Sequence, residues 1–187
     1  VKEDHTIWNG TKGWRKYRRV QTSFNKTKPP TREYKVGGTA MVGFDNLAFH
    51  ITAQEEDSRL LGRWSTITIT GKNELKTTII TCYCPVVSNS TGSAYAQQLI
   101  YMSEHREKIA ERLKCPRQLF GYDLSKVIGK LTDQGHQLIV CGDFNSDYKT
   151  LSEWFLDEGM QDIIAKKHGK MPITYQRSRQ DPLDCVF

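Results

Sequence analysis

The stretch Leu138-Ile139-Val140-Cys141-Gly142-Asp143-Phe144-Asn145 decides the fold of this chain. The apolar run from Leu138 to Cys141 predicts a short strand that is buried on both sides. A glycine ends the run, and the polar residues Asp143 and Asn145 follow directly. Polar side chains at the end of such a strand are held at an open edge in layered α/β proteins. The sequence therefore predicts a chemically useful site at this strand end.

The region before this stretch is rich in threonine, isoleucine and valine, which favour strands. Isoleucine alternates with serine and threonine from Ser65 to Thr70, as in a strand with one buried face. Turn residues separate the segments of this region. They predict a mostly antiparallel meander with strands at residues 39–44, 47–53, 64–70 and 76–83.

Three helices and a final strand complete the predicted elements. Apolar residues recur at three- and four-residue steps between residues 93 and 114, which predicts a long amphipathic helix. Pro116 stops it, and the apolar face from Leu119 to Leu131 predicts a second helix. A third helix at 150–158 ends at Gly159, and a strand is expected at 183–187. We expect an α/β (α+β) fold of two packed mixed β-sheets flanked by helices.

The length of the chain, 187 residues, is that of one domain with one core. Residues 1–35 are expected to be a basic, loop-rich segment of that domain, and residues 36–187 its central and C-terminal part. The apolar and aromatic content is too high for a disordered tail, and no apolar run approaches the roughly 20 residues of a membrane span. The chain has five cysteines, an odd number that excludes complete internal pairing, and four of them lie within or beside strand-like runs, which favours a reducing compartment.

Positive charge is concentrated at the start of the chain, whose formal net charge is +6. Residues 1–35 carry ten basic and three acidic side chains. The basic residues include a cluster interleaved with aromatic side chains: Arg15, Lys16, Arg18 and Arg19. Such a segment neutralises phosphates while its aromatic rings stack on bases, and an ordinary solvated surface is the alternative interpretation.

Two strand ends hold the first candidate catalytic residues. A carboxylate at Asp143 takes a proton from water, while the Asn145 amide holds the water or a phosphate oxygen. A turn in which these two side chains cap backbone N–H groups is the alternative. Tyr83 ends another strand, just before Pro85, and its phenol either donates to a phosphate or is an ordinary half-buried side chain.

Asp184 is the third acidic candidate, because it lies in the apolar run Leu183 to Phe187. A buried carboxylate is costly unless it is paired or hydrogen-bonded. The residue therefore either orients a histidine or a metal partner, or belongs to a structural salt bridge.

Together these segments resemble the endonuclease/exonuclease/phosphatase family, which includes apurinic endonucleases and pancreatic-type deoxyribonuclease. The Tyr83-Cys84-Pro85 and Gly142-Asp143-Phe144-Asn145 segments are similar to the family's strand-end motifs, and Thr174-Tyr175, Ser178 and Leu183 to Phe187 to its penultimate segment. The spacing is most similar to the endonuclease domain attached to reverse transcriptases of non-LTR retrotransposons. The resemblance covers about Val36 to Phe187.

The resemblance implies hydrolysis of a DNA phosphodiester with Mg²⁺ or Mn²⁺ as the cofactor. It assigns catalytic roles to Tyr83, Asp143, Asn145 and Asp184, with Asp143 shared with the metal, and a substrate contact to Thr174. It further implies DNA as partner, a linked reverse transcriptase, no membrane partner, and an intracellular location that is the nucleus in a eukaryotic host.

Two parts of the family pattern have no match in this sequence. The metal-holding glutamate that should precede the central sheet has no counterpart before Val36, and Glu3 lacks the apolar strand that should lead to it. The closing histidine should follow Asp184, and the sequence ends at Phe187. We therefore expect a chain with half of the site, inactive or nearly so, truncated at both ends.

Two other functions stay open on the sequence. The same fold serves phosphatases and phosphodiesterases that act on inositol phosphates or lipids, and the basic segment argues mildly against that substrate. A decayed retroelement remnant that binds nucleic acid or nothing is the other alternative.

Overall fold

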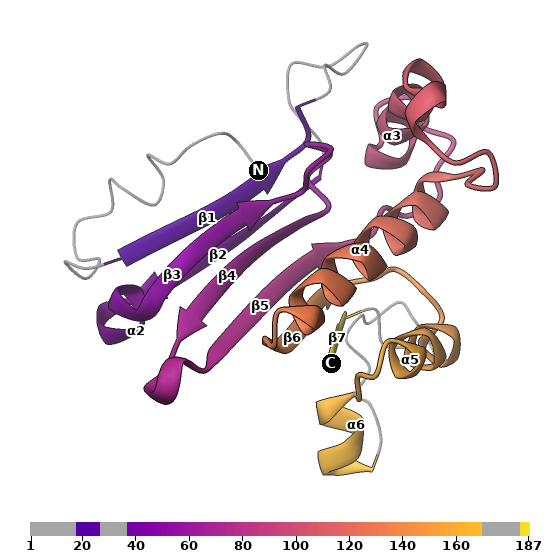
Figure 1. Ribbon diagram of the computed structural model, residues 1–187. Helices are drawn as coiled ribbons and strands as arrows, with labels where there is room; N and C mark the ends of the chain where they lie inside the picture. The colour runs from indigo at the N-terminus through magenta and orange to yellow at the C-terminus, as the bar shows by residue number, and fades with distance from the viewer. Residues whose placement is uncertain (1–17, 27–36, 170–183) are drawn as a thin grey trace.

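The computed structural model describes residues 18–26, 37–169 and 184–187 (Figure 1). These residues form a two-stranded and a five-stranded sheet, with the orders β1-β2 and β3-β4-β5-β6-β7. The strands are β1 (Arg18–Phe24), β2 (Gly38–Phe44), β3 (Ile51–Glu56), β4 (Trp64–Thr70), β5 (Lys76–Tyr83), β6 (Gln137–Asp143) and β7 (Asp184–Val186). The helices are α2 (Asp45–His50), α3 (Ala94–Glu104), α4 (Pro116–Asp133), α5 (Tyr148–Asp157) and α6 (Ile163–His168), and the short 3₁₀ helices are η1 (Lys72–Glu74) and η2 (Arg106–Lys108).

The five-stranded sheet combines both strand directions. Strands β3, β4 and β5 form three strands of the predicted antiparallel meander, whereas residues 39–44, predicted as its first strand, belong to β2 and pair with β1 in the smaller sheet. Strand β6 then pairs parallel to β5, because α3 and α4 carry the chain back to the other end of the sheet. Strand β7 closes the described edge with antiparallel pairs to β6. The expected α+β fold with two packed sheets and flanking helices is confirmed.

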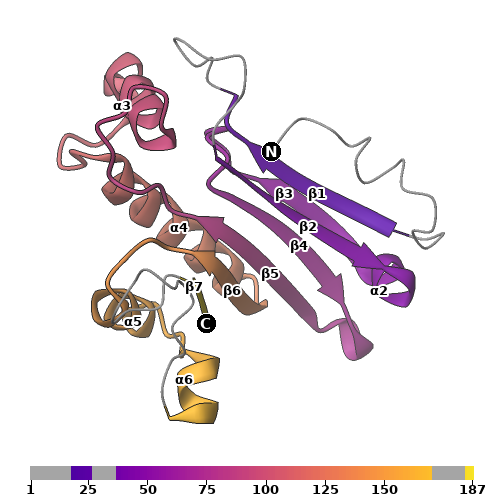
Figure 2. The same cartoon turned by 180° about the vertical axis from the view of Figure 1, so that it is seen from behind.

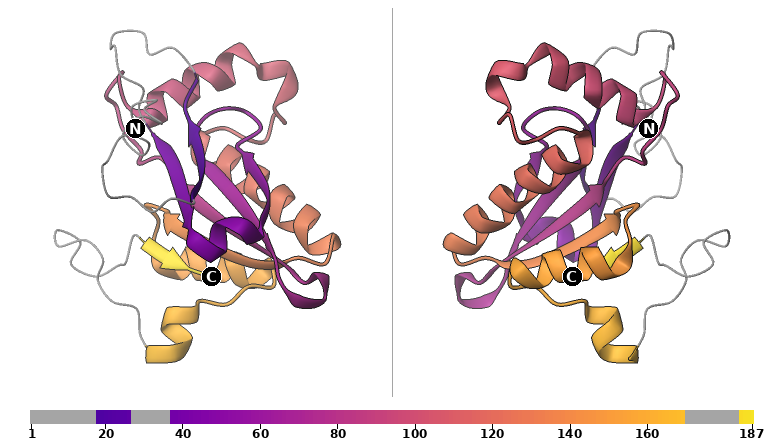
Figure 3. Two further views of the ribbon diagram at one scale, coloured as in Figure 1. Left: turned by 90° about the vertical axis from the view of Figure 1, so that its left-hand side faces the viewer. Right: turned by 90° about the vertical axis from the view of Figure 1, so that its right-hand side faces the viewer.

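The layers are seen from behind in Figure 2 and edge-on in Figure 3. The β1–β2 sheet packs on one face of the larger sheet, where the hydroxyls of Thr39 and Ser65 lie 2.9 Å apart. Helices α4 and α5 lie on the other side of the five-stranded sheet, α3 lies at one end of the molecule and α6 at the other. Among the described helices none has the length and hydropathy needed to cross a membrane.

The main core lies between the five-stranded sheet and the helices. Alternate residues of β5, such as Ile80 and Cys82, point into it, as do Val140 from β6 and Leu124 from α4. The intervening residues of these strands face the smaller sheet and are half-buried. The prediction that residues 138–141 form a strand buried on both sides is wrong. Of these residues only Val140 is fully buried, and the others are half-buried.

A buried ion network fastens the β3–β4 connection to α4. Arg63 and Asp57 have no exposed side-chain surface, and two hydrogen bonds of 2.7 Å join the guanidinium to the carboxylate. Arg63 also donates to Asp123 of α4 at 3.0 Å, and Arg59 donates to the same carboxylate at 2.6 Å. The Arg63 guanidinium lies 4.4 Å from the ring centroid of Trp64. The network joins a loop to a helix that is distant in sequence.

Two predicted elements near the start of the described chain differ from the structure. Residues 18–24 were expected in loops and form β1, because pairing with β2 supplies backbone hydrogen bonds that local sequence does not reveal. Residues 47–50 were expected in a strand and belong to α2, after which β3 runs on to Glu56. Asp45 starts α2 with a left-handed backbone, φ +49°, which redirects the chain.

The long helix expected at residues 93–114 ends at Glu104. Ser93 caps its start, as its hydroxyl accepts from the Ala96 backbone N–H at 3.1 Å. Beyond the helix, Ile109 packs with Met102 of α3 and Leu119 of α4. The apolar periodicity therefore marks residues that share a small core, although the second half of the segment is mostly irregular. Helix α6 was not expected, because it is short.

Replacing Arg63 with Met should lower the free energy of unfolding by about 3–5 kcal/mol, since the Asp57 carboxylate would stay buried without its cation. Urea unfolding measures the change. Lys26→Met is the matched control, because Lys26 pairs with Glu56 at 2.9 Å on the surface and such a pair contributes at most about 1 kcal/mol. Equal effects of the two substitutions would contradict a structural role for the buried network.

Candidate active site

Three of the four predicted catalytic residues lie in one row across neighbouring strands. Tyr83 at the end of β5 is paired with Asp143 at the end of β6, and Asp143 is paired with Asp184 of β7. Residues directly opposite one another point to the same face of a sheet, and adjacent strands are about 4.8 Å apart. A phenol and two carboxylates therefore stand side by side on the face opposite α4 and α5.

The segment after β6 is fixed by what surrounds its glycine and its phenylalanine. Gly142 passes so close to β5 that a side chain there would overlap the Cys82 carbonyl oxygen. Phe144 is 1% exposed and points into the helix-side core, with edge-to-face contacts to Phe155 and Phe187 at centroid distances of 5.4 and 6.2 Å. Burial of Phe144 on one face commits Asp143 to the other.

Asn145 joins the row through a turn. The strand ends at Asp143, and Asn145 has a left-handed backbone, φ +48°, so a turn and not an extended backbone sets the relative positions of the two side chains. The Asn145 backbone N–H donates to Asp143 Oδ1 at 3.2 Å, and its side-chain amide donates to the Cys84 carbonyl at 3.0 Å. The capping turn considered for these residues is thus present in part: Asp143 caps a backbone N–H, whereas the Asn145 amide donates to a carbonyl, and the turn holds this amide beside the carboxylate.

The pKa values of the row follow from its half-buried position. Burial raises the pKa of Asp143, the Asn145 side chain opposes this shift, and the Asp184 charge adds to it. Burial also raises the pKa of Tyr83, with a smaller contribution from the Asp143 charge. At neutral pH Asp143 is consequently a stronger base than an ordinary aspartate, while the Tyr83 phenol keeps its proton for donation.

Arg117 of α4 braces the two strand ends from the helix side. Its guanidinium donates to the Pro85 carbonyl at 3.1 Å and to the Phe144 carbonyl at 3.4 Å. The sequence patterns did not identify Arg117. The available signal was its position in the first turn of a predicted helix, next to Pro116. Gly37 packs near Tyr83, since a Cβ there would stand 3.5 Å from the Tyr83 ring, which is an ordinary contact distance.

The donors in the row suit a hard divalent cation. Asp143 and Asp184 offer two carboxylates, and Mg²⁺ is typically held in proteins by one or two carboxylates together with waters and substrate phosphate. Within residues 18–26, 37–169 and 184–187, no group of three or more His, Cys, Asp or Glu side chains is placed to hold a metal. The described residues thus fit a Mg²⁺ site that depends on substrate or water for its other ligands.

Asp184 differs from its sequence interpretation in one respect. The residue is exposed at the edge of the sheet, so the expected cost of burying its carboxylate does not arise. Its place in the row comes from strand pairing with β6 instead.

Two of the remaining predicted site residues, Arg18 and Arg19, lie away from the row. Arg18 and Arg19 pair with Phe44 and Gly43, at the end of the small sheet beside α2 (Figure 1). Tyr83 lies at the other end, close to Gly37 at the start of β2. The other three, Thr174, Arg15 and Lys16, lie outside the described residues.

Comparison with solved structures supports the fold. The chain is similar to the crystal structure of the Xenopus laevis APE2 catalytic domain, with a TM-score of 0.54 and 13% sequence identity. The match covers 91% of this chain and 66% of that one. No protein-family model matches the sequence, and no curated protein matches it. At this identity the likeness shows a shared fold.

Replacing Asp143 with Asn should raise the melting temperature at pH 7. The folded-state pKa of Asp143 lies above its unfolded value, so its ionised form costs stability above the folded pKa, and the cost disappears below the unfolded pKa of about 3.9. The difference between variant and wild type should therefore vanish near pH 3.

Asp147→Asn is the matched control, with the opposite sign expected. Hydrogen bonds from Thr150 lower the pKa of Asp147, so its charge stabilises the fold at neutral pH and that contribution is lost as the pH falls through the folded pKa. The melting temperatures of wild type and both variants are compared by thermal unfolding at pH 7 and near pH 3. A lower melting temperature for Asp143→Asn at pH 7 would contradict the described environment of Asp143.

Proposed function

We propose that this chain carries part of the site of a metal-dependent DNA endonuclease, a phosphodiester hydrolase. The observation that carries the proposal is the row of Tyr83, Asp143 and Asp184 at three neighbouring strand ends, with the Asn145 amide beside it. The fold shared with the Xenopus laevis APE2 catalytic domain supports it.

Each residue has a role that its surroundings favour. Asp143, whose pKa is raised, accepts a proton from the water whose oxygen attacks phosphorus. The Asn145 amide fixes that water or a phosphate oxygen, and the protonated Tyr83 phenol donates to a phosphate oxygen as negative charge increases. The bond from phosphorus to the leaving sugar oxygen breaks, and that oxygen takes up a proton. A Mg²⁺ ion held by Asp143 and Asp184 would supply stabilisation of the phosphoryl charge.

The biological setting is the finer part of the proposal. The motif spacing supports an endonuclease that nicks target DNA to prime reverse transcription by a covalently linked reverse transcriptase, in a reducing compartment that is the nucleus in a eukaryotic host. The 187 residues span 66% of the length of the similar APE2 structure. We propose that the metal-holding glutamate and the closing histidine of the family pattern lie in sequence that flanks these 187 residues.

The direct test is nicking of supercoiled plasmid with Mg²⁺ by the chain and by a form extended at both ends along its reading frame. We expect nicking by the extended form, and a loss of about 10²–10⁴-fold on Asp143→Asn, as for removal of a general base. Asp147→Asn makes the same chemical change four residues away and should leave nicking unchanged, because asparagine also caps a helix. Retained nicking by Asp143→Asn would refute the role of Asp143.

The basic cluster has its own test, since Arg18 and Arg19 lie at the opposite end of the sheet from Tyr83. Replacing Arg15, Lys16, Arg18 and Arg19 together with Gln should weaken DNA binding. It should also reduce the slope of log K against log salt by up to about 0.9 for each phosphate that the variant no longer neutralises. Fluorescence anisotropy of labelled duplex over a salt series measures the slope. An unchanged slope would contradict a role in DNA binding and support the alternative interpretation of the cluster as an ordinary solvated surface.

A further inference from the structure

A second concave site lies on the helix side of the same strand ends. It is a pocket of about 390 Å³ between α4, α5 and the ends of β5 and β6. This volume lies in the range of small-molecule sites, which is roughly 300–1,000 Å³. Its apolar wall consists of Cys84, Phe120, Phe144, Leu151 and Trp154. Phe120 belongs to α4, and Leu151 and Trp154 belong to α5, so the pocket lies on the helix side of the strand ends, whereas Asp143 faces the other side.

The polar groups around this pocket are largely engaged with the protein. Arg117 donates to two carbonyl oxygens, as described above. Gln118 Oε1 accepts from the Lys114 backbone N–H at 2.7 Å, and Thr150 Oγ1 donates to Asp147 at 2.7 Å. Burial raises the pKa of the Cys84 thiol to about 11, so it is uncharged at neutral pH. A cationic or strongly polar ligand would find few groups able to replace its water, and Arg117 adds a positive charge to the pocket wall.

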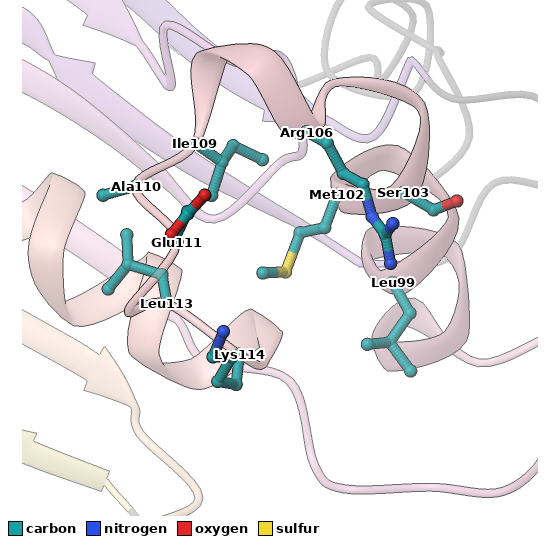
Figure 4. Close-up of a pocket in the computed structure, with 9 residues that line it drawn as sticks. All are labelled: Leu99, Met102, Ser103, Arg106, Ile109, Ala110, Glu111, Leu113 and Lys114. Atoms are coloured by element: carbon teal, nitrogen blue, oxygen red, sulfur yellow. The ribbon is translucent and has the colours of Figure 1, made fainter.

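The larger pocket near α3 has a different character. Its volume is about 560 Å³, and Arg106, Glu111 and Lys114 are among its lining residues (Figure 4). These charged side chains lie around Met102 and Leu113 at the open side of the pocket. Nothing in that arrangement selects one class of ligand, whereas the pocket behind the strand ends is apolar and bordered by three aromatic rings.

We propose that the pocket formed by Cys84, Phe120, Phe144, Leu151 and Trp154 binds a small uncharged aromatic molecule. A flat ring packs edge-to-face or offset against the phenylalanine and tryptophan rings and removes apolar surface from water. The volume admits one or two fused rings, since a cavity of about 150 Å³ already holds benzene.

A ligand in this pocket would contact residues that position the candidate active site. Phe144 lines the pocket and lies between Asp143 and Asn145 in sequence. Cys84 also lines it, and its carbonyl accepts the hydrogen bond from the Asn145 amide. A ligand in the pocket therefore lies against the segment whose turn holds the amide beside the carboxylate.

Gly121 offers a way to close the pocket. The residue lies within α4 on the pocket wall, and a Cβ added there would meet no atom within 4 Å. Gly121→Leu thus fills the space while replacing a poor helix former with a good one. Gly129→Leu is the matched control, because Gly129 lies in the same helix, has the same open space and is not on the pocket wall.

Indole is the probe, and thermal unfolding of the protein without metal or DNA is the measurement. We expect millimolar indole to raise the melting temperature of wild type and Gly129→Leu by about 2–4 °C, and that of Gly121→Leu by much less. Tryptamine, which carries a positive charge, should have little effect, because Arg117 gives the pocket wall a positive charge. No rise in wild type, an equal rise in Gly121→Leu, or an equal rise with tryptamine would overturn the proposal.

If Gly121→Leu fails to fold, NMR chemical shifts of the wild-type protein on addition of indole provide a second test. Indole should shift the Trp154 indole N–H and the Leu151 methyl resonances, and leave the Ile79 methyl group on the opposite face of β5 unshifted. Shifts at Ile79 and none at Leu151 would contradict the assigned site. Neither measurement depends on nicking, so this proposal and the proposed function fail independently.

Discussion

The register of β5, β6 and β7 is the constraint on which the site depends. Phe144, Val140 and Cys82 are buried against α4 and α5, so the residues that alternate with them must face the other way. A slip of one residue in β6 would turn Phe144 out of the core and Asp143 into it, at the cost of a large apolar burial and of an unpaired buried carboxylate. The core thus selects the one register in which Tyr83, Asp143 and Asp184 align.

The buried ion network supports that register from the neighbouring strand. Arg63 precedes β4, and its backbone carbonyl accepts from the Tyr83 N–H at 2.8 Å, just where β5 ends. Its guanidinium is held by Asp57 and by Asp123 of α4. The position of the Tyr83 backbone is therefore linked to a loop and to a helix through one fully buried side chain. Arg117 does the same from the helix side for the ends of β5 and β6.

Local patterns in the sequence predicted the elements whose side chains alternate clearly, and they missed those that depend on distant partners. Strand β4 was predicted with its observed bounds because its isoleucines alternate with threonines, and the glycine before Asp143 marked the strand end that carries the site. Strand β1 was missed, since only pairing with β2 makes it a strand. The turn at Asn145 was only the alternative interpretation of its segment, and the braces from Arg63 and Arg117 were missed, because they rest on contacts between segments far apart in the chain.

The central claim is that Asp143 and Asp184 stand side by side in one row with Tyr83. Carbon-13 NMR titration of the Asp143 carboxyl group tests it most directly, in wild type and in Asp184→Asn. The account predicts a pKa for Asp143 above the ordinary aspartate value of about 3.9, and a lower pKa once the neighbouring charge is removed. An Asp143 pKa that is ordinary, and unchanged by the substitution at Asp184, would contradict the row and the candidate site with it.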